Sequence, residues 1–562
     1  MTEIADAEDA LPPPPGSTAS EMFPVLTSAQ QTRVLAHGRR RTVEQNEIVV
    51  ELNEPVTKVF LVVSGQLHAL QVLNNQENVV AICNPGMFTG ELTVLSGRRG
   101  LLRIRAGEKS ELIEFEREAL QALVETDSEL SDIFLRAFIL RRLELIAREV
   151  GDIVLIGSSH SLATLRIKDF LTRNYQPYSY IDLDRDAEVQ ELVDRFSLSI
   201  DDMPVLICRG TAVLRNPSNE EITNCLGFNE GIDRDHVRDL VIVGAGPAGL
   251  AAAVYAASEG LDVLVLESSG PGGQAGASSK IENYLGFPTG ISGHELAGRA
   301  YTQAQKFGAQ MLIAKDARGL ACSRRPYKVL IGDGQSLPAR AVIIASGAQY
   351  RRLNLGNLSK FEGVGVYYGA THLEAQLCSG EEVIVVGGGN SAGQAAVFLA
   401  QTTRRVLVLV RSGGLAETMS RYLIRRIEDT PNIELHSNSE VVALEGNDHL
   451  ERVTWRNNQT GQTESHNIAH LFSMTGAVPN SAWLDGCVAC DQAGFIKTGS
   501  DLTTEDLANA EWPLSRPPYL LESTLPGVFA VGDIRAGNVK QVASAVGEGS
   551  IALSFVHQVL AE

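Results

Sequence analysis

Two glycine-rich turns constrain the fold of this chain more than any other feature of its sequence. The first reads Gly-Ala-Gly-Pro-Ala-Gly over residues 244–249, and the second reads Gly-Gly-Gly-Asn-Ser-Ala over residues 387–392. Each follows an apolar run typical of a buried strand and precedes a run typical of a helix. Glycine allows the sharp turn, the close approach of a pyrophosphate and the tight packing of helix on strand. The pattern therefore predicts two Rossmann-like units, each with a dinucleotide at a helix N-terminus.

The first turn carries the pattern of an FAD site. Its glycines are Gly244, Gly246 and Gly249, and the next strand-like run, residues 263–266, is followed by Glu267. An acid about 20 residues beyond such a turn holds the ribose hydroxyls of the adenosine half. Because strand, glycines, helix, strand and acid occur in the required order, we assign this unit to FAD.

The second turn differs at the end of its second strand, where an arginine stands in place of the acid. The strand-like run 406–410 is followed by Arg411. A guanidinium suits the ribose 2′-phosphate of NADPH, whereas an acid would repel it. The alternative is that Arg411 is a solvated charge at a strand end. The sequence favours NADPH, bound by Gly387, Gly389, Asn390, Ser391, Ala392 and Arg411.

Composition places these two units in a larger protein. The 562 residues are too many for one hydrophobic core and predict about three or four domains. The formal net charge of −20 argues against a nucleic-acid partner, which favours a basic face. No uninterrupted apolar run has the length of a membrane-spanning helix, so we expect no membrane association.

The N-terminal segment and the cysteines predict a cytoplasmic protein. Residues 1–20 are acidic, contain four consecutive prolines and lack the basic start and apolar core of a signal peptide, so we expect a disordered tail. The chain has seven scattered cysteines. An odd number without an export signal indicates reduced thiols in the cytoplasm.

From about residue 239 to the C-terminus the chain resembles the low-molecular-weight thioredoxin reductases. Four separated motifs occur in the order of that family: residues 272–274, 280–288, 527–533 and 540–545. The resemblance implies that several of their residues surround the flavin. In the family, the matching positions border the flavin ring (Gly273, Gln274, Asn283), hold the ribityl chain (Gly532, Asp533) or lie beside the flavin (Gln541).

The same resemblance implies the topology. The NADPH-binding domain, residues 351–479, is expected as an insertion in an FAD-binding domain made of residues 233–350 and 480–562. Residues 343–347 and 474–476 resemble the two crossover segments of the family. The family also implies a homodimer.

One departure from the family concerns how electrons leave the flavin. Thioredoxin reductases carry a Cys-x-x-Cys dithiol at a place where this chain has Gly369 and His372. His372 is either a proton donor near the flavin or a structural histidine. A different Cys-x-x-Cys, Cys487 and Cys490, lies in a strand-like setting. It is either a redox pair or a coincidence of spacing.

Residues 151–232 resemble the thioredoxin and glutaredoxin fold. The pattern predicts strands at 152–156, 178–183 and 203–208 and helices at 162–173 and 189–196, with a cis-proline at Pro204 before the third strand. Ser161 and Thr164 occupy the positions of the catalytic cysteines of that fold. They retain capping ability without thiolate chemistry, so we expect a redox-inactive docking or spacer domain.

Residues 21–150 resemble a cyclic-nucleotide-binding domain. Short strand-like segments with turn signals predict a β-roll or jelly roll, followed by a helix over 128–148. Residues 88–95 resemble the phosphate-binding cassette, in which Gly90, Glu91 and Arg99 are the candidates to hold a cyclic nucleotide. The arginine is expected near residues 100–101, but Arg98 and Arg99 come slightly earlier and Arg103 and Arg105 come slightly later. The domain therefore either binds cAMP or cGMP or serves as a dimerisation module.

These features predict a multidomain α/β protein with an N-terminal β-roll. The favoured function is an NADPH-dependent FAD oxidoreductase, with a cyclic nucleotide as possible regulator. Its acceptor is either a disulfide of a thioredoxin-like partner or a small oxidant such as a quinone, a dye or oxygen. The alternatives are a flavin and cyclic-nucleotide redox sensor with little turnover, or a structural partner that has kept the cofactor sites and lost catalysis.

Overall fold

The computed structural model describes residues 19–73, 76–148, 153–158, 161–183, 202–208, 212–278, 280–332, 334–370, 372–447 and 449–562. The chain divides into two compact units. The first comprises the residues up to Arg238 with Ala253–Gly270 and Tyr301–Asp316, and the second comprises Asp239–Ala252, Pro271–Ala300 and Ala317–Glu562. The five-part division predicted from the sequence is finer, and its boundaries stay predictions. Of the predicted tail, residues 1–18 lie outside the described residues.

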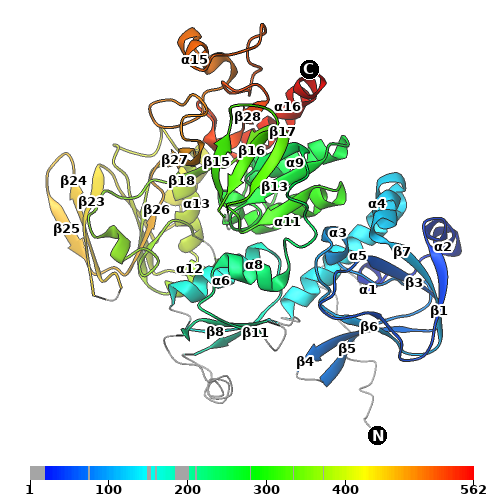
Figure 1. The fold of residues 1–562 in the computed structure, drawn as a ribbon. Coiled ribbons are helices and arrows are strands. Elements are labelled where there is room, and N and C mark those ends of the chain that lie inside the picture. The colour runs from blue at the N-terminus through cyan, green and yellow to red at the C-terminus, as the bar shows by residue number, and fades with distance from the viewer. Residues whose placement is uncertain are drawn as a thin grey trace. The chain divides into compact units, whose positions relative to one another are not determined.

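The first unit opens with the predicted β-roll (Figure 1). Two antiparallel sheets form it, with the strand orders β1-β7-β3 and β2-β6-β4-β5. The strands are β1 Arg39–Val43, β2 Ile48–Val50, β3 Lys58–Ser64, β4 Leu67–Leu73, β5 Gln76–Cys83, β6 Arg103–Ala106 and β7 Ser110–Glu116. The helices are α1 Ala19–Met22, α2 Ser28–Leu35, α3 Thr93–Ser96, α4 Arg117–Thr126 and α5 Ser128–Ala147.

Helix α5 matches the C-terminal helix predicted over 128–148, and its first turn explains where it begins. The side chain of Asp127 caps it by accepting the N–H of Leu130 at 3.0 Å. Phe134 and Phe138 of α5 pack against Phe88 of the cassette, with ring centroids 4.0 and 5.9 Å apart. These rings join the cassette to the helix through the core of the β-roll.

The segment that resembles thioredoxin forms a four-stranded sheet in the order β11-β10-β8-β9. Its elements are β8 Ile153–Gly157, α6 Leu162–Arg173, β9 Ser179–Asp182, β10 Val205–Cys208, β11 Ala212–Arg215 and α8 Asn219–Leu226. Ser161 caps α6 as expected, and the Met203–Pro204 peptide bond is cis. The helix predicted over 189–196 lies outside the described residues. Membership of the thioredoxin fold stays a prediction.

The first glycine turn has the predicted sequence of elements around it: β12 Arg238–Val243, α9 Pro247–Ser258 and β13 Val263–Glu267. In the first unit, β13 pairs in parallel with β14 Gln310–Ile313. In the second unit, strands follow the order β12-β17-β16-β15, and β28 pairs with β17. The remaining elements are α10 Gly273–Gly276, α11 Gly293–Lys306, β15 Ala317–Ala321, β16 Tyr327–Ile331, β17 Ser336–Ile344, β28 Val528–Ala530 and α16 Val542–Ala561.

The second glycine turn belongs to a parallel sheet in the order β19-β26-β20-β21-β22. An antiparallel sheet, β23-β24-β25, lies beside it in the chain, and β18 pairs with β27 at the predicted crossover (Figure 1). Their bounds are β18 Ala348–Tyr350, β19 Val366–Tyr367, α12 His372–Leu377, β20 Glu382–Val386, α13 Asn390–Leu399, β21 Arg405–Leu409, α14 Arg421–Glu428, β22 Ile433–His436, β23 Ser439–Glu445, β24 Arg452–Asn457, β25 Thr463–His466, β26 His470–Ser473 and β27 Ala477–Pro479.

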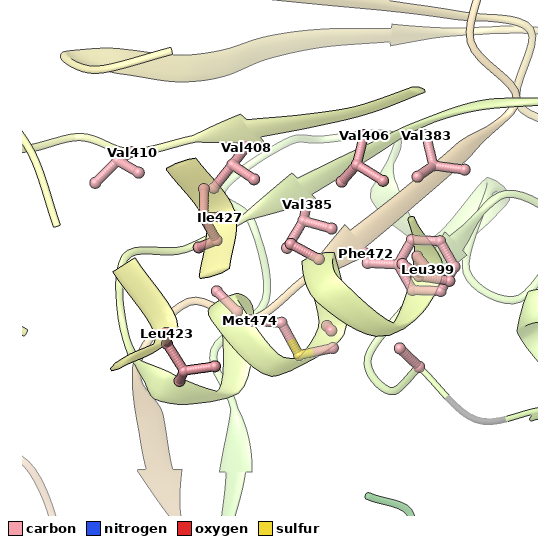
Figure 2. Close-up of a cluster of buried hydrophobic side chains, with 14 of the residues drawn as sticks. Val383, Val385, Leu399, Val406, Val408, Val410, Leu423, Ile427, Phe472 and Met474 are labelled. Atoms are coloured by element: carbon pink, nitrogen blue, oxygen red, sulfur yellow. The ribbon is translucent and has the colours of Figure 1, made fainter. Parts of the chain in front are cut away.

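Apolar packing fixes the second turn on this sheet. Figure 2 shows valines of β20 and β21 gathered against side chains of α13 and α14. Each fully buried valine or leucine contributes roughly 1.5–3 kcal/mol. The labelled members are Val383, Val385, Leu399, Val406, Val408, Val410, Leu423, Ile427, Phe472 and Met474.

The second unit also contains short elements and a long C-terminal helix. Helix α16 packs against β17 and against the 3-10 turn η6, Gly532–Ile534 (Figure 1). The other short helices are η3 Leu358–Lys360, η4 Ala482–Leu484, η5 Gly499–Asp501 and α15 Thr504–Asn509. In the described ranges, no helix combines the length and apolar character needed to span a membrane.

Candidate functional site

In the first glycine turn, the first and third glycines are tightly packed, whereas the second has free space beside it. A Cβ on Gly244, whose φ is +107°, would lie 2.4 Å from the carbonyl oxygen of Ala345. A Cβ on Gly249 would lie 1.8 Å from the carbonyl oxygen of Gly244. On Gly246, by contrast, the nearest atom would be 3.9 Å away. The first and third glycines are therefore required for packing, while the second leaves room for a ligand at the start of α9.

A second glycine pair lies against this turn. The N–H of Gly272 donates to the carbonyl of Ala245 at 2.8 Å, and a Cβ on Gly273 would be 3.0 Å from the Cα of Gly246. The side-chain amide of Gln274 donates to the carbonyl of Ala348 at 2.5 Å. The structure thus brings the predicted flavin-edge segment against the first glycine turn.

The predicted ribityl-binding acid lies at the same place. A Cβ on Gly532 would be 2.9 Å from the Cβ of Ala248 in α9, which puts Asp533 beside the helix. Burial raises the pKa of Asp533, Lys540 opposes this shift and Glu548 adds to it. Asp533 is half-buried, and a carboxylate can accept hydrogen bonds from a polyol, so its predicted ribityl contact stays a prediction.

The other residues predicted to bind FAD are Glu267, Asn283 and Gln541. Glu267 ends β13 as predicted, is 8% exposed and accepts the N–H of Ser269 at 2.9 Å. Asn283 is exposed, and Gln541 is the exposed residue that precedes α16. Their contacts with a flavin or its adenosine half stay predictions.

The second glycine turn repeats the arrangement of the first. Gly387 has a φ of +146°, and its Cβ would lie 2.6 Å from the carbonyl oxygen of Met474. A Cβ on Gly389, which precedes α13, would have its nearest neighbour 3.9 Å away. The Asn390 side chain accepts the N–H of Ser420 at 2.7 Å and so fixes the loop that approaches the turn. Here too the glycine next to the helix leaves the backbone accessible.

The predicted phosphate-binding arginine follows β21. Arg411 is exposed, and among the described residues no carboxylate forms an ion pair with it. A guanidinium that has no protein carboxylate partner is available to a phosphate. Whether it binds one stays a prediction.

Tyr350 of β18 was not found from the sequence. It packs against the core cluster of the sheet that carries the second turn. Burial raises the pKa of Tyr350, Ser391 opposes this shift, and the charge of Asp533 adds to it. No sequence signal could have found this packing, because it depends on the crossover at β18.

The cysteine prediction needs a correction. Cys487 forms a disulfide with Cys322, so the expected set of reduced thiols is wrong for these two residues. Cys487 does not pair with Cys490, whose sulfur lies 3.8 Å from the carbonyl oxygen of Val488. The strand expected around Cys487 is also wrong, since Cys487 lies in a bend after η4, Ala482–Leu484. Because η4 packs against β15, the fold brings Cys322 and not Cys490 to the sulfur of Cys487.

The two positions that the resemblance aligns with the family's dithiol are Gly369 and His372. A Cβ on Gly369 would have no neighbour within 4 Å, and α12 begins at His372. The side chain of His372 lies outside the described residues, so its two proposed roles stay open. No group of three or more His, Cys, Asp or Glu side chains suited to a metal ion occurs in the described parts of the chain.

The cassette of the β-roll differs from the expectation at its arginine. Gly90 has a φ of +101°, which suits the turn, and Glu91 bonds Thr93 and, at 3.3 Å, Arg142 of α5. Arg99, the candidate for the cyclic phosphate, instead forms an ion pair with Glu230. Its charge is therefore already balanced by a carboxylate of the chain.

Arg98 is also engaged by other parts of the first unit. It is 8% exposed and donates to the hydroxyl of Tyr301 at 2.8 Å and to the carbonyl of Asn174 at 3.3 Å. Its guanidinium lies 4.1 Å from the ring centroid of Phe228. Both cassette arginines therefore dock the β-roll onto neighbouring segments.

The comparisons with known proteins agree with this geometry. Residues 238–549 match the family described as pyridine nucleotide-disulphide oxidoreductase, and residues 40–127 match the cyclic nucleotide-binding domain. The thioredoxin reductase of Ureaplasma parvum serovar 3 is 32% identical over 323 residues, which cover 57% of this chain and 96% of that protein. The chain belongs to the thioredoxin reductase family.

Other members of the family match a similar share of this chain. NADPH-dependent thioredoxin reductase 3 of Arabidopsis thaliana is 32% identical over 323 residues, covering 56% of this chain and 57% of that protein. The crystal structure of Lactococcus lactis thioredoxin reductase in its FR conformation is 27% identical, with a TM-score of 0.51, and covers 58% of this chain and 99% of that one. The family implies FAD and NAD(P)H as cofactors, and both open glycine turns fit such dinucleotides.

Proposed function

We propose that the chain is an NADPH-dependent flavoprotein oxidoreductase with FAD at the first glycine turn and NADPH at the second. The observation that carries this proposal is the shared openness of Gly246 and Gly389, each beside a helix N-terminus. A bound flavin would accept a hydride from NADPH and pass the electrons to an acceptor. The chain's own residues bind and orient the two cofactors.

On the FAD side, the N–H groups of the first turn of α9 would bind the pyrophosphate. Glu267 would accept from the adenosine ribose and Asp533 would bond the ribityl hydroxyls. The position of Asp533 beside α9 supports its role, since carboxyl and backbone groups then serve adjacent parts of one ligand. As the resemblance implies, the ring itself would be bordered by Gly273, Gln274, Asn283 and Gln541.

On the NADPH side, the N–H groups at the start of α13 and the hydroxyl of Ser391 would bind the pyrophosphate. Arg411 would pair with the 2′-phosphate, which supports NADPH over NADH. The relative in Arabidopsis thaliana is named as NADPH-dependent, in line with this preference.

The acceptor is either a disulfide of a thioredoxin-like partner or a small oxidant. Gly369 and His372 remove the usual dithiol relay, which supports direct transfer from the flavin. The same absence supports a second candidate, a flavin redox sensor that turns over little. In both cases we expect a homodimer in the cytoplasm, as the resemblance implies.

An anaerobic titration separates these functions. Purified holoprotein mixed with NADPH should lose its oxidised flavin absorbance, and NADH should act more slowly. Failure to bleach with either nucleotide contradicts the oxidoreductase. Reoxidation by thioredoxin, a quinone or oxygen identifies the acceptor class, whereas bleaching with slow reoxidation by all three favours the sensor.

We further propose that the β-roll regulates this activity and that cAMP or cGMP is its ligand. Glu91 would bond the ribose 2′-hydroxyl, and to do so it would exchange its contact with Arg142. Arg142 also donates to the carbonyl of Tyr175 at 2.8 Å, and the ring of Tyr175 stacks on Tyr301 of α11 at 6.4 Å. These contacts run from Glu91 through Arg142 and Tyr175 to α11. They support the proposal that nucleotide binding at Glu91 changes the conformation of a helix in the flavin-binding region.

Calorimetry with cAMP and cGMP tests the regulatory proposal. We expect Arg142→Gln to bind the nucleotide more tightly than the unaltered chain, because the competing side chain is removed, and Glu91→Ala to bind it weakly. Tyr301→Ala, which removes the ring stacked on Tyr175, should bind the nucleotide normally but lose the effect of the nucleotide on flavin reduction. Absence of binding in every variant would leave a docking or dimerisation module as the role of the β-roll.

A further inference from the structure

The Cys322–Cys487 disulfide joins the end of β15 to the segment after η4. Cys322 follows β15, and Cys487 follows η4, which packs against β15. The Cα atoms of the two cysteines are 6.2 Å apart, within the range of roughly 4.4–6.8 Å usual for disulfides. The bond closes a loop with a sequence separation of 165, and the whole insertion lies within that loop.

The segment that the disulfide anchors is the return strand of the crossover. Strand β27 pairs with β18, and the side chain of Asn480 donates to the carbonyl of Ser346 at 2.8 Å. Ser346 in turn donates its hydroxyl to the carbonyl of Asn480 at 2.9 Å. The disulfide adds a covalent link to these hydrogen bonds, just beyond the point where the chain re-enters the FAD-binding region.

The surroundings of Cys487 suit the reduced state as well as the oxidised one. Its sulfur lies 3.1 Å from the carbonyl oxygen of Leu320. A disulfide sulfur has no hydrogen to donate, but a thiol at this position would find an acceptor already in place. Both cysteines are partly exposed, so a reductant has access to the bond.

The other cysteines show that this oxidation is selective. Cys83, Cys208, Cys225, Cys378 and Cys490 are not disulfide-bonded. Burial, reinforced by Asp491, raises the pKa of Cys490 and disfavours the thiolate that an internal attack on Cys487 would need. A single accessible disulfide among thiols is the setting in which redox-active rather than purely structural disulfides occur.

We propose that Cys322–Cys487 is a redox site that reacts with an external dithiol protein of the thioredoxin type and thereby releases the return strand. One thiolate of the dithiol attacks a sulfur of the Cys322–Cys487 bond and forms a mixed disulfide. The second thiol of the partner then attacks the partner's own sulfur in this mixed disulfide, which breaks the bond between the two proteins and releases the second thiol of this chain. The products are two thiols on this chain and one disulfide on the partner, so two electrons and two protons pass from partner to chain.

This inference goes beyond the proposed function, because it requires neither hydride transfer nor a cyclic nucleotide. It is tested on full-length holoprotein purified in air, with and without reduced thioredoxin, by alkylation and peptide mass spectrometry. We expect Cys322 and Cys487 to resist alkylation before treatment and to become labelled together after it. Buried Cys83 and Cys208 serve as internal controls that stay unlabelled in both samples.

Hydrogen exchange measures the structural effect. Residues 477–487 should exchange about tenfold faster in the reduced protein, since a long-range cross-link is lost. Cys322→Ser should show the fast exchange without any reductant, and Cys490→Ser should behave as the unaltered chain. Because the reductant arm uses the natural sequence, it remains informative if a variant fails to fold.

Four results would overturn the proposal. The first is that both cysteines are already alkylated in the air-purified protein. The second is that they become labelled only after denaturation, which would make the disulfide structural. The third is equal exchange at 477–487 in the two redox states. The fourth is full reduction by NADPH alone, which would assign the electrons to the chain's own flavin site and not to an external dithiol.

Discussion

The glycine turns and the cassette of the β-roll both match ligand-binding patterns, but their surroundings differ. At Gly246 and Gly389 the space beside the backbone is open. At the cassette, Glu91 bonds Arg142 and Arg99 pairs with Glu230, so the side chains expected to bind a ligand already bind the protein. A backbone cradle made of glycine offers no side chain that could be diverted in this way, whereas a site built from charged side chains depends on which partners the fold brings near.

The largest loss of stability is expected from a substitution in the first glycine turn. Gly249→Ala places a methyl group 1.8 Å from the carbonyl oxygen of Gly244, and we expect a loss of about 3 kcal/mol or more of stability with almost no flavin retained. Gly246→Ala is the matched control. It should keep its melting temperature within a few degrees yet retain less flavin, because its Cβ enters the open face. Equal unfolding of both variants would contradict the distinction between packing and ligand glycines.

Acid should destabilise the β-roll by protonating Glu114. Burial raises its pKa, but hydrogen bonds from Lys58, Arg39 and Arg41 outweigh this and lower it to about 2. The folded state thus favours the ionised form, so its stabilisation is present above about pH 4.5 and is lost as the pH falls toward 2. In urea unfolding, the free energy of unfolding of the unaltered chain should fall by up to about 3 kcal/mol between neutral pH and pH 2 through this group, and Glu114→Gln should abolish that part of the fall.

The control for Glu114 is on the same strand. Glu111→Gln alters a 38% exposed side chain paired with Arg40 and should change stability by less than about 1 kcal/mol. Similar pH profiles for the two variants would show that the charge cluster around Glu114 does not govern the acid response.

Arg98→Ala tests whether the cassette turn serves docking. Loss of the contacts with Tyr301, Asn174 and Phe228 should cost about 2 kcal/mol in thermal unfolding and leave the affinity for cAMP or cGMP unchanged. Arg40→Ala, at a 54% exposed position, should be nearly neutral in both measurements. A selective loss of nucleotide binding by Arg98→Ala would instead make Arg98 the phosphate ligand.

The smallest effect concerns the choice of nicotinamide cofactor. Arg411→Ala should raise the KM for NADPH about tenfold and leave that for NADH unchanged, since one charge-assisted contact with phosphate is worth about 1.4 kcal/mol or more. Arg404→Ala, which alters a 70% exposed side chain paired with Glu382, should change neither KM. Parallel increases for NADPH and NADH would favour the solvated strand-end alternative for Arg411.

Local patterns predicted much of the fold because they report local physics. The order of β12, Gly244, α9 and β13 follows from apolar runs and from glycines that a Cβ would exclude. Helix α5 was predicted nearly to its ends from its resemblance to the C-terminal helix of cyclic-nucleotide-binding domains, and the structure shows that Asp127 caps its first turn. The pairing of Cys322 with Cys487 could not be predicted, because nothing in the sequence around either residue specifies a partner 165 positions away.

The sequence by itself determined the two dinucleotide-type turns, the motifs of the thioredoxin reductase family and the lack of cysteines at 369 and 372. These depend on backbone conformation and on residue identity, which short segments specify. Only the tertiary structure decided that Tyr350 packs against the core of the second-turn sheet, that Arg98 and Arg99 bind other segments, and that Cys487 bonds Cys322. The physical reason is that a side chain's partner is set by which distant segments the fold packs against it.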